Sequence, residues 1–512
     1  MVPARCYLTD PTDQFWSPVG AINYVKPPER NFVTGGEFKI ALPPRTYKLV
    51  VERGPEYRAI TKQVVIQSGE SREERIELQR WVNMNARGWY SGDLHNHRDV
   101  GDMDQLMLAE DLNIAPTLTE WVWEDSHISR APKTSTKALA IRRIDDTHVY
   151  STQDTEIERL REGPGAVDLV GLNAPISFSG YRLFPPSDVF TKATHARQGW
   201  VDAEKITWRD GAALMALGQV DFAGIVHNHF NRHGVETETA PWGMIPKGKP
   251  EYETPLGMAL WTMDVYYKFL NCGFKLAVSA GSASGVKPAP LGFNRVYVHM
   301  TEKFGYRPWF RALKAGHSFG TNGPMLFLTV NGKEPGETIV VPGGAGKSSK
   351  TLKVHVEAST AGQLEKLEIL WKGQVVKYVV SSETGSILIG DAEIEVNDTG
   401  WIAARAFEKS SPSIRFAQTS PVYVQVGSSR GIVAGDVKFF LEWMDSEIAY
   451  YRSQVGFKSE SDRQAMLDFF RGARAVFERQ EARGETLECR AERKEREAKR
   501  LETSAGAATT PK

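Results

Sequence analysis

The stretch WYSGDLHNH, residues 89–97, carries the pattern that decides the fold and the chemistry of this chain. Its histidines, His95 and His97, follow an aromatic and apolar run that is typical of a strand. Residues i and i+2 of a strand point to the same side, so both imidazoles face one space. A second such pair, His227 and His229, also follows an apolar run, although the chain has only 11 histidines in 512 residues. Each pair is suited to a metal ion, and the alternative is a hydrogen-bonded structural pair.

The same stretch marks a change of pattern along the chain. Before it, residues 1–83 predict strands alone: apolar residues alternate over 38–42 and 47–51 around a Pro-Pro turn, which indicates a hairpin, and short strands are expected at 64–66 and 76–78. A small β-sandwich is the expected closure. Residues 84–324 alternate strands with helices, which predicts an α/β domain built on a mainly parallel sheet or barrel.

Beyond this domain, residues 325–430 return to a strand pattern and predict a second β-sandwich. Residues 431–512 form a helical segment, because apolar residues from Val437 to Tyr451 recur at spacings of three and four. After Arg483 the sequence is dense in charge and predicts a frayed helix and a disordered tail.

Carboxylates near the predicted strand ends complete a candidate site. Glu120 closes an apolar run and is a candidate ligand or general base, with a surface glutamate as the alternative. Asp93 is expected to orient a ligating imidazole, or to cap a turn. Glu156, with Glu158 as its rival, lies in a charged stretch that also fits a solvated helix face. The tryptophans at 121, 123 and 242 either line a pocket for an apolar or sugar-like ligand or belong to the core.

Composition excludes several classes of protein. Lys and Arg number 63, as do Asp and Glu, so the formal net charge is zero and a general binder of nucleic acid or anionic membranes is not expected. No apolar run approaches the roughly 20 residues that span a bilayer, so no membrane insertion is expected. The three cysteines are far apart and form neither a disulfide framework nor a zinc knuckle. Any metal must therefore use His and carboxylate ligands.

The first residues, MVPARCYL, have no signal-peptide core. The location is therefore unknown: cytoplasmic for the sequence as given, and exported or periplasmic if a leader precedes it. The sequence likewise leaves the oligomeric state open.

Several motifs resemble one enzyme family. GDLHNH at 92–97 resembles the opening metal motif of hydrolases of the PHP (polymerase and histidinol phosphatase) superfamily, and more closely that of the CehA/McbA metallohydrolases. TNGP at 321–324, followed by VNG at 330–332, resembles the exit from that family's barrel. SAGSASGV at 279–286, with NRVYV at 294–298, resembles a subgroup common in planctomycete-type bacteria. The N-terminal part is similar to carboxypeptidase-regulatory-like sandwiches, and the resemblance covers roughly residues 1–480.

The chain departs from the family pattern at three places. TEW at 119–121 stands where the family has Thr-Asp-His, GSA at 281–283 stands where it has Gly-Ser-Asp, and the His expected after the mid-barrel Glu is absent near residue 165. A trinuclear centre is therefore not expected. The resemblance implies a site for one or two divalent ions (Zn, Mn or Fe) with six candidate ligands. They are His95, His97, Glu120, Glu156 and His229, with His227 as a further candidate.

The leading hypothesis is a metal-dependent hydrolase on a PHP-like distorted α/β barrel between two β-sandwiches. Metal-activated water would attack an ester, carbamate or phosphoester bond of a small-molecule or glycan-like substrate, with Glu120 or Glu156 shuttling the proton. The alternative is a catalytically degenerate PHP barrel that binds glycan or protein. A third hypothesis is a structural protein stabilised by metal.

Overall fold

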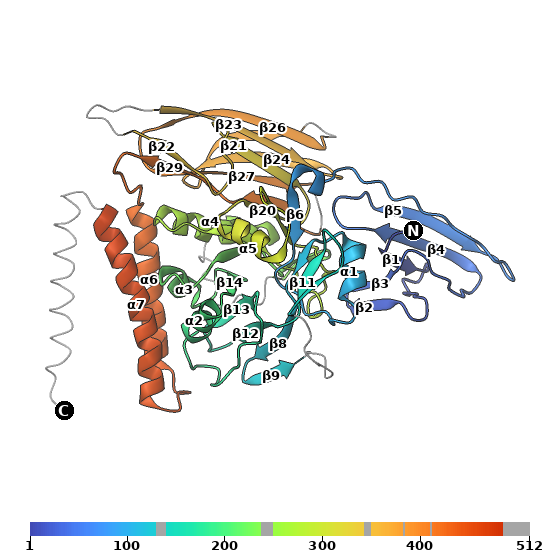
Figure 1. Ribbon diagram of the computed structural model, residues 1–512, viewed down its shortest axis with the longest axis horizontal. Helices are drawn as coiled ribbons and strands as arrows, with labels where there is room; N and C mark the ends of the chain where they lie inside the picture. Colours follow the sequence, from blue (N-terminus) through green and yellow to red (C-terminus); the bar gives the residue numbers. More distant parts are fainter. Residues whose placement is uncertain (130–139, 237–248, 343–349, 382–384, 410–411, 485–512) are drawn as a thin grey trace.

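The computed structural model describes residues 1–129, 140–236, 249–342, 350–381, 385–409 and 412–484. These residues form a mixed α/β protein with several sheets (Figure 1). The N-terminal sheet lies at one end, the helices α6 and α7 lie at the other, and the strands that follow residue 325 lie along a third side. Trp242 and the tail predicted as disordered, residues 485–512, lie outside the described residues.

The N-terminal region forms one antiparallel five-stranded sheet in the order β2-β3-β1-β4-β5. Its strands are β1 (Ala4–Thr9), β2 (Ile22–Lys26), β3 (Glu29–Thr34), β4 (Arg45–Glu52) and β5 (Ile60–Ile66). The hairpin expected over 38–51 is wrong in its first half, because residues 37–44 form no strand and β4 pairs with β1 and β5. The two prolines of the predicted turn interrupt pairing, and Phe38 packs edge-on against Phe32 instead. The short strand expected at 76–78 is also absent.

The central domain is built on a seven-stranded sheet in the order β18-β15-β14-β13-β12-β8-β9. Its strands are β8 (Leu118–Trp123), β9 (Ser126–Ser129), β12 (Asp154–Arg159), β13 (Gly165–Val170), β14 (Trp200–Ala203), β15 (Phe222–Val226) and β18 (Ala277–Ala280). Three pairs are parallel and three are antiparallel, so the sheet is mixed rather than mainly parallel as expected. The difference arises because the turn at 160–164 joins β12 and β13 as a hairpin, with no helix between them.

Four helices accompany these strands, and a fifth precedes the C-terminal region. They are α1 (Met103–Glu110), α2 (Asp188–Ala196), α3 (Gly211–Ala216), α4 (Pro255–Asn271) and α5 (Tyr306–Lys314). The sequence explains the ends of α4: the Thr254 side chain accepts a hydrogen bond from the Gly257 N–H, Pro255 occupies the first turn, and Gly273 follows the helix at φ +83°. The remaining short strands of this part are β10 (Ile141–Arg143), β11 (Val149–Ser151), β16 (Phe230–Asn231) and β17 (Gly234–Val235).

The histidine motif follows β6 (Trp89–Gly92), which pairs in parallel with β7 (Ile114–Ala115). Beyond β6 the chain bends at Leu94 and bonds to residues of, or close to, β18 and β8 of the central sheet. The Leu94 N–H donates to the Ala280 carbonyl at 3.0 Å and the His97 N–H to the Ser284 carbonyl at 2.7 Å, while the Asn96 carbonyl accepts from the Leu118 N–H at 2.8 Å. Segment 94–97 therefore joins the β18 side of the sheet to its β8 side.

A second, twelve-stranded sheet runs from the central domain into the C-terminal region. Its main path is β10-β11-β7-β6-β19-β20-β28-β27-β24-β25, with β29 beside β27 and β22 beside β29. Its remaining strands are β19 (Arg295–His299), β20 (Ser318–Thr321), β22 (Thr338–Val341), β24 (Leu364–Trp371), β25 (Gln374–Val380), β27 (Gly400–Glu408), β28 (Phe416–Thr419) and β29 (Val422–Val426). The β20–β28 pair crosses the domain boundary that the sequence places between 324 and 325.

A three-stranded sheet packs against the C-terminal part of this large sheet (Figure 1). Its strands are β21 (Met325–Val330), β23 (Lys350–Ser359) and β26 (Ile387–Val396). Leu352, Val354 and Val356 of β23 are buried and alternate with exposed residues, which is the pattern of a strand with one face on a core. Two facing sheets over residues 325–426 are compatible with the expected β-sandwich.

The C-terminal helices α6 (Ala434–Ser453) and α7 (Glu460–Gly484) pack side by side against the central domain, on the side away from the N-terminal sheet (Figure 1). Val437, Phe440 and Met444 are buried, as their spacing predicts. No helix in the described residues is both long and apolar enough to cross a membrane.

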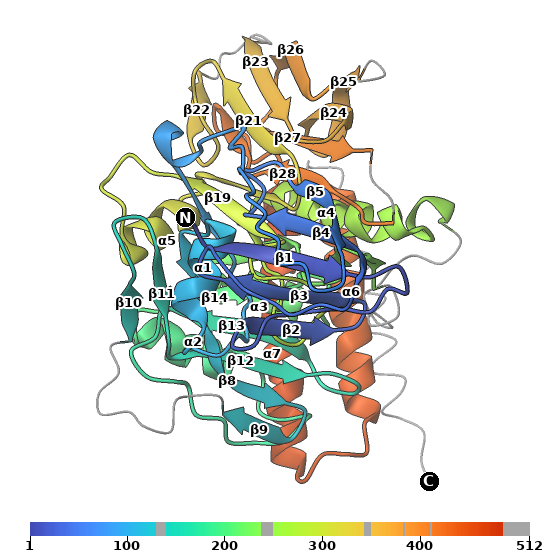
Figure 2. The same cartoon turned by 90° about the vertical axis from the view of Figure 1, so that its right-hand side faces the viewer.

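The N-terminal sheet lies against α1, as Figure 2 shows with this sheet toward the viewer. Arg5 of β1 makes the contact ionic, because its guanidinium bonds both Glu110 at the end of α1 and Glu52 of β4. Arg232 also donates to both oxygens of Glu52, at 2.6 Å each. These buried charges tie residues 1–66 to the central domain.

Replacement of Arg5 by leucine is expected to lower the free energy of unfolding by about 3 kcal/mol, because it leaves Glu110, which is 3% exposed, without its partner. Urea unfolding followed by circular dichroism measures the change. Arg30→Leu is the matched control, since Arg30 pairs with the exposed Asp13 and its loss is expected to cost below about 1 kcal/mol. Equal effects in the two variants would contradict this assignment.

Candidate metal centre

Three buried side chains bring their ligand atoms together. His95 Nε2 lies 3.0 Å from His97 Nε2, and His97 Nε2 lies 2.9 Å from Glu156 Oε2. The third distance, from His95 Nε2 to Glu156 Oε1, is 3.6 Å. With metal–nitrogen bonds of 2.0–2.1 Å, the ligand atoms of a tetrahedral site lie roughly 3.3 Å apart. Two imidazoles and one carboxylate at this spacing form a donor set that fits a divalent ion.

The backbone explains why the two histidines converge. Segment 94–97 is held in place by its backbone bonds to residues 280, 284 and 118, and the side chains of His95 and His97 converge, with their Nε2 atoms 3.0 Å apart. The loop beneath them is made of small residues. A Cβ at Gly281 would lie 2.5 Å from His95 Cβ, and a Cβ at Gly285, where φ is +107°, would lie 2.5 Å from the His97 carbonyl oxygen. The Gly- and Ser-rich loop 279–285 therefore packs closely under the ligands.

Replacement of Gly281 by alanine is expected to weaken divalent metal binding about tenfold, because the added methyl must displace His95. Competition with a chromogenic chelator measures the affinity. Gly435→Ala is the control, since a Cβ there meets nothing within 4 Å. An unchanged affinity in Gly281→Ala, with the fold intact, would show that the His95 backbone tolerates the displacement.

Sheet register places Glu156 at this point. It pairs with Trp121 of β8 on one side and with Asp168 of β13 on the other, and Asp168 pairs in turn with Asp202 of β14. Paired residues on neighbouring strands share a face, so these four side chains form one row across the sheet. The stretch around Glu156, where a solvated helix face was the alternative, is a buried strand.

The second nitrogen of His95 faces two further carboxylates. Its Nδ1 lies 3.2 Å from Asp168 Oδ2 and 3.3 Å from Glu204 Oε2. A carboxylate on the far nitrogen fixes the tautomer of a ligating histidine and leaves the lone pair of Nε2 for the metal. Neither oxygen of Asp168 is engaged in a hydrogen bond with the described residues, and the side chain is fully buried. Asp168 is thus placed to orient His95.

The charges around the centre are strongly coupled. Burial opposes the charge on Glu156, but His95 and His97 outweigh it and lower the pKa of Glu156 to about 2. Burial likewise disfavours charge on His95, yet Asp168 and Glu156 raise its pKa well above the usual range. Burial, with the charges of Glu156 and Glu204, raises the pKa of Glu158 to about 8.

The three remaining carboxyls of the group differ in direction, and burial raises the pKa of Asp168 well above its usual range. Burial and the charge of Glu204 raise the pKa of Asp202 to about 7, although Ser279 donates a hydrogen bond to it at 2.6 Å. Lys205 outweighs burial at Glu204 and lowers its pKa; the ammonium bonds Glu204 and, at 2.9 Å, the Asn228 side chain. The pKa values of Glu158, Asp168 and Asp202 are all raised, and a divalent ion bound here would favour the charged forms of these carboxyls.

The other predicted site residues lie elsewhere. Asp93 accepts hydrogen bonds from the backbone N–H groups of His95, Ser282 and Gly292, so it fixes the backbone rather than the imidazole. Glu120 pairs with Thr155, one residue out of step with Glu156, and therefore projects from the opposite face of the sheet. The structure does not bring Glu120 to the three ligand atoms.

The second histidine pair also lies apart from these atoms. His227 Nε2 is 3.3 Å from Thr262 Oγ1, and His227 Nδ1 accepts from the backbone N–H of His229. Burial and the nearby Lys205 lower the pKa of His227 to about 3 and lower that of His229 strongly. Both imidazoles are therefore neutral, and their contacts match the structural alternative.

Asp168, Asp202, Glu204 and Lys205 were not among the predicted residues. Single carboxylates inside the apolar runs 167–170 and 200–203 were the available signal, because a lone charge in a buried strand requires a partner. The pairing of the strands decides which residue lies next to each carboxylate, and this pairing could not be predicted from the sequence.

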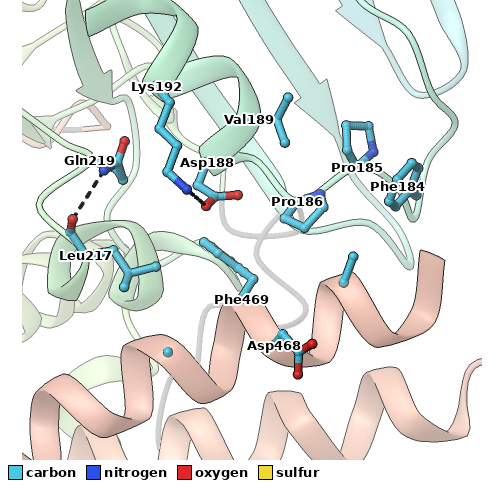
Figure 3. Close-up of a pocket in the computed structure, with 12 residues that line it drawn as sticks. Phe184, Pro185, Pro186, Asp188, Val189, Lys192, Leu217, Gln219, Asp468 and Phe469 are labelled. Atoms are coloured by element: carbon cyan, nitrogen blue, oxygen red, sulfur yellow. Dashed lines mark hydrogen bonds and ion pairs between the residues drawn. The ribbon is translucent and has the colours of Figure 1, made fainter. Parts of the chain in front are cut away.

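A cleft of about 480 Å³ opens elsewhere, between α2 and α7 (Figure 3). Phe184, Pro186 and Phe469 supply apolar walls, and Lys192 is paired with Asp188 on its rim. Its lining contains no Ser, Thr, Cys or His, and it includes none of the residues of the candidate ligand group.

Comparison with known protein families and with curated proteins found no match for this chain. The assignment of function therefore rests on the residues and their geometry.

Proposed function

We propose that this protein is a metal-dependent hydrolase that cleaves an ester, carbamate or phosphoester bond. The observation that carries the proposal is the convergence of His95 Nε2, His97 Nε2 and the Glu156 carboxylate in a buried space. Two neutral nitrogens and one carboxylate are the ligand set of many hydrolytic zinc sites, which keep a position open for water. The pairing of Asp168 and Glu204 with the far nitrogen of His95 supports a site of this kind.

The proposal extends to the architecture. Backbone bonds run from β8 through β12, β13, β14, β15 and β18 and return through segment 94–97 to β8, which supports a distorted α/β barrel around the ligands. A closed arrangement of this kind, together with the motif at 92–97, favours a relationship to the PHP hydrolases. The relationship stays a proposal.

A divalent ion held by His95, His97 and Glu156 would lower the pKa of a water from about 16 toward 7. The residues of the chain supply the remaining functions. Asp168 holds the His95 ring in place. Glu158, two residues beyond Glu156 on the same strand face, has a carboxyl that keeps its proton near neutral pH and is placed to give it to a leaving group. Glu158 replaces Glu120 and Glu156 as the proton carrier.

Elemental mass spectrometry of the purified protein, followed by a screen with 4-nitrophenyl acetate, a 4-nitrophenyl carbamate and 4-nitrophenyl phosphate, tests the proposal. We expect about one bound divalent ion per chain and hydrolysis that a chelator abolishes and added metal restores. Metal without turnover on any ester class would favour a structural site. Failure to bind metal after reconstitution would overturn the proposal and would favour the alternative function, a barrel that binds glycan or protein without catalysis.

A further inference from the structure

Two stacked tryptophans lie beside the ligands. The rings of Trp121 and Trp123 are 5.7 Å apart between centroids and inclined by 23°. The ring of Trp121 lies 5.1 Å from that of His97, and Trp123, on the far side of Trp121, is 46% exposed. The pair thus extends from the ligands to the surface.

The register of β8 and β12 gives this surface its direction. Trp121 pairs with Glu156 in a buried row, and Trp123 pairs with Glu158 in the next row on the same face. Rows on one face are two residues apart, or roughly 7 Å, which is about the length of one sugar ring with its linkage. Glu158 is partly exposed, and its Oε2 accepts a hydrogen bond of 3.0 Å from Trp121 Nε1. The outer row is therefore an indole face beside a fixed carboxylate.

The charge of the surroundings selects among ring-bearing ligands. Glu156, Glu158 and Asp168 occupy the two rows, and the inner row continues to Asp202. The two rows hold no Lys or Arg, the side chains that bind phosphates and acids, whereas carboxyl groups exchange hydrogen bonds with hydroxyl groups. A flat apolar face for stacking, together with hydroxyls at its edge, describes a neutral pyranose ring.

We propose that Trp123, backed by Trp121, binds one ring of a neutral saccharide that carries an ester or carbamate group, and presents that group to the metal centre. This substrate class rests on the proposed function, but binding at the platform does not need the metal. The saccharide ring stacks on the exposed face of Trp123, and the Glu158 carboxyl exchanges hydrogen bonds with its hydroxyls.

Calorimetric titration with cellotriose, xylotriose and mannotriose, and with 2-naphthol as an aromatic probe, tests the proposal. We expect at least one trisaccharide to bind, Trp123→Ala to weaken that binding about tenfold, and Trp123→Phe to restore part of it. Tyr378→Ala on β25 is the matched control, because Tyr378 is 52% exposed and lies in the C-terminal region. Binding of 2-naphthol alone, or of no probe, would overturn the saccharide assignment.

The His95→Ala/His97→Ala variant separates this proposal from the proposed function. It is expected to bind the trisaccharide within about threefold of the unaltered protein, since Trp123 touches neither histidine in the stacked arrangement. Saccharide binding without hydrolysis of any ester would uphold the platform and overturn the hydrolase. If the protein hydrolyses an ester and Trp123→Ala leaves saccharide binding unchanged, the hydrolase is upheld and the platform is overturned.

Discussion

Simultaneous replacement of His95 and His97 by alanine is expected to remove the bound divalent ion and all chelator-sensitive hydrolysis. The two imidazoles supply two of the three converging ligand atoms, and Glu156 alone cannot hold an ion against water. Elemental mass spectrometry and ester hydrolysis measure the two losses. Circular dichroism must show that the variant keeps its fold, because both side chains are buried.

The second histidine pair provides the matched control. His227→Ala/His229→Ala removes two buried imidazoles of the same spacing, and we expect the metal content to stay unchanged because this pair contacts Thr262 and lies beside Lys205. Metal retained by His95→Ala/His97→Ala but lost by His227→Ala/His229→Ala would place the ion at the other pair.

Asp168→Asn is expected to weaken metal binding and lower the rate of hydrolysis by about 10- to 100-fold while the protein stays folded. The amide keeps the shape of the side chain but cannot take up the negative charge that would hold the Nδ1 proton of a ligating His95, whose Nδ1 lies 3.2 Å from Asp168 Oδ2. Chelator competition gives the affinity, and the pH profile of hydrolysis is expected to shift with it.

An exposed pair offers the control for this variant. His355 Nδ1 lies 2.8 Å from Asp391 Oδ1 on the C-terminal sheet, so Asp391→Asn breaks an Asp–His contact far from the ligands in the sequence and should leave the affinity unchanged. If Asp168→Asn binds metal normally and Glu204→Gln does not, Glu204 rather than Asp168 orients the ring.

Local patterns predicted the parts of the site that one strand defines. The spacing of His95 and His97 is a property of a single extended segment, and the apolar runs that became β15 and β29 were visible in the sequence. The apolar stripe of α6 was predictable for the same reason, because its spacing of three and four residues is a property of one helix.

Properties that depend on pairing between strands were not predictable in this way. Glu120 and Trp121 are neighbours in the sequence, and only the register against β12 decides that Trp121 faces the ligands and Glu120 does not. The charged residues of β12 resembled a solvated helix because their partners, His95 and His97, lie about sixty residues away. The hairpin expected at 38–51 failed for the same reason, since β4 found its partners in β1 and β5.

The sheet that crosses from β6 to β28 also sets an order of events during synthesis. The segment that carries His95 and His97 leaves the ribosome early, yet its backbone partners at residues 280 and 284 follow nearly two hundred residues later. β6 pairs with β19, β19 with β20, and β20 with β28, whose residues are made later still. The nascent chain therefore carries its candidate metal ligands unassembled until these partners are made, and the segment 94–97 reaches its final position only after residue 284 is available.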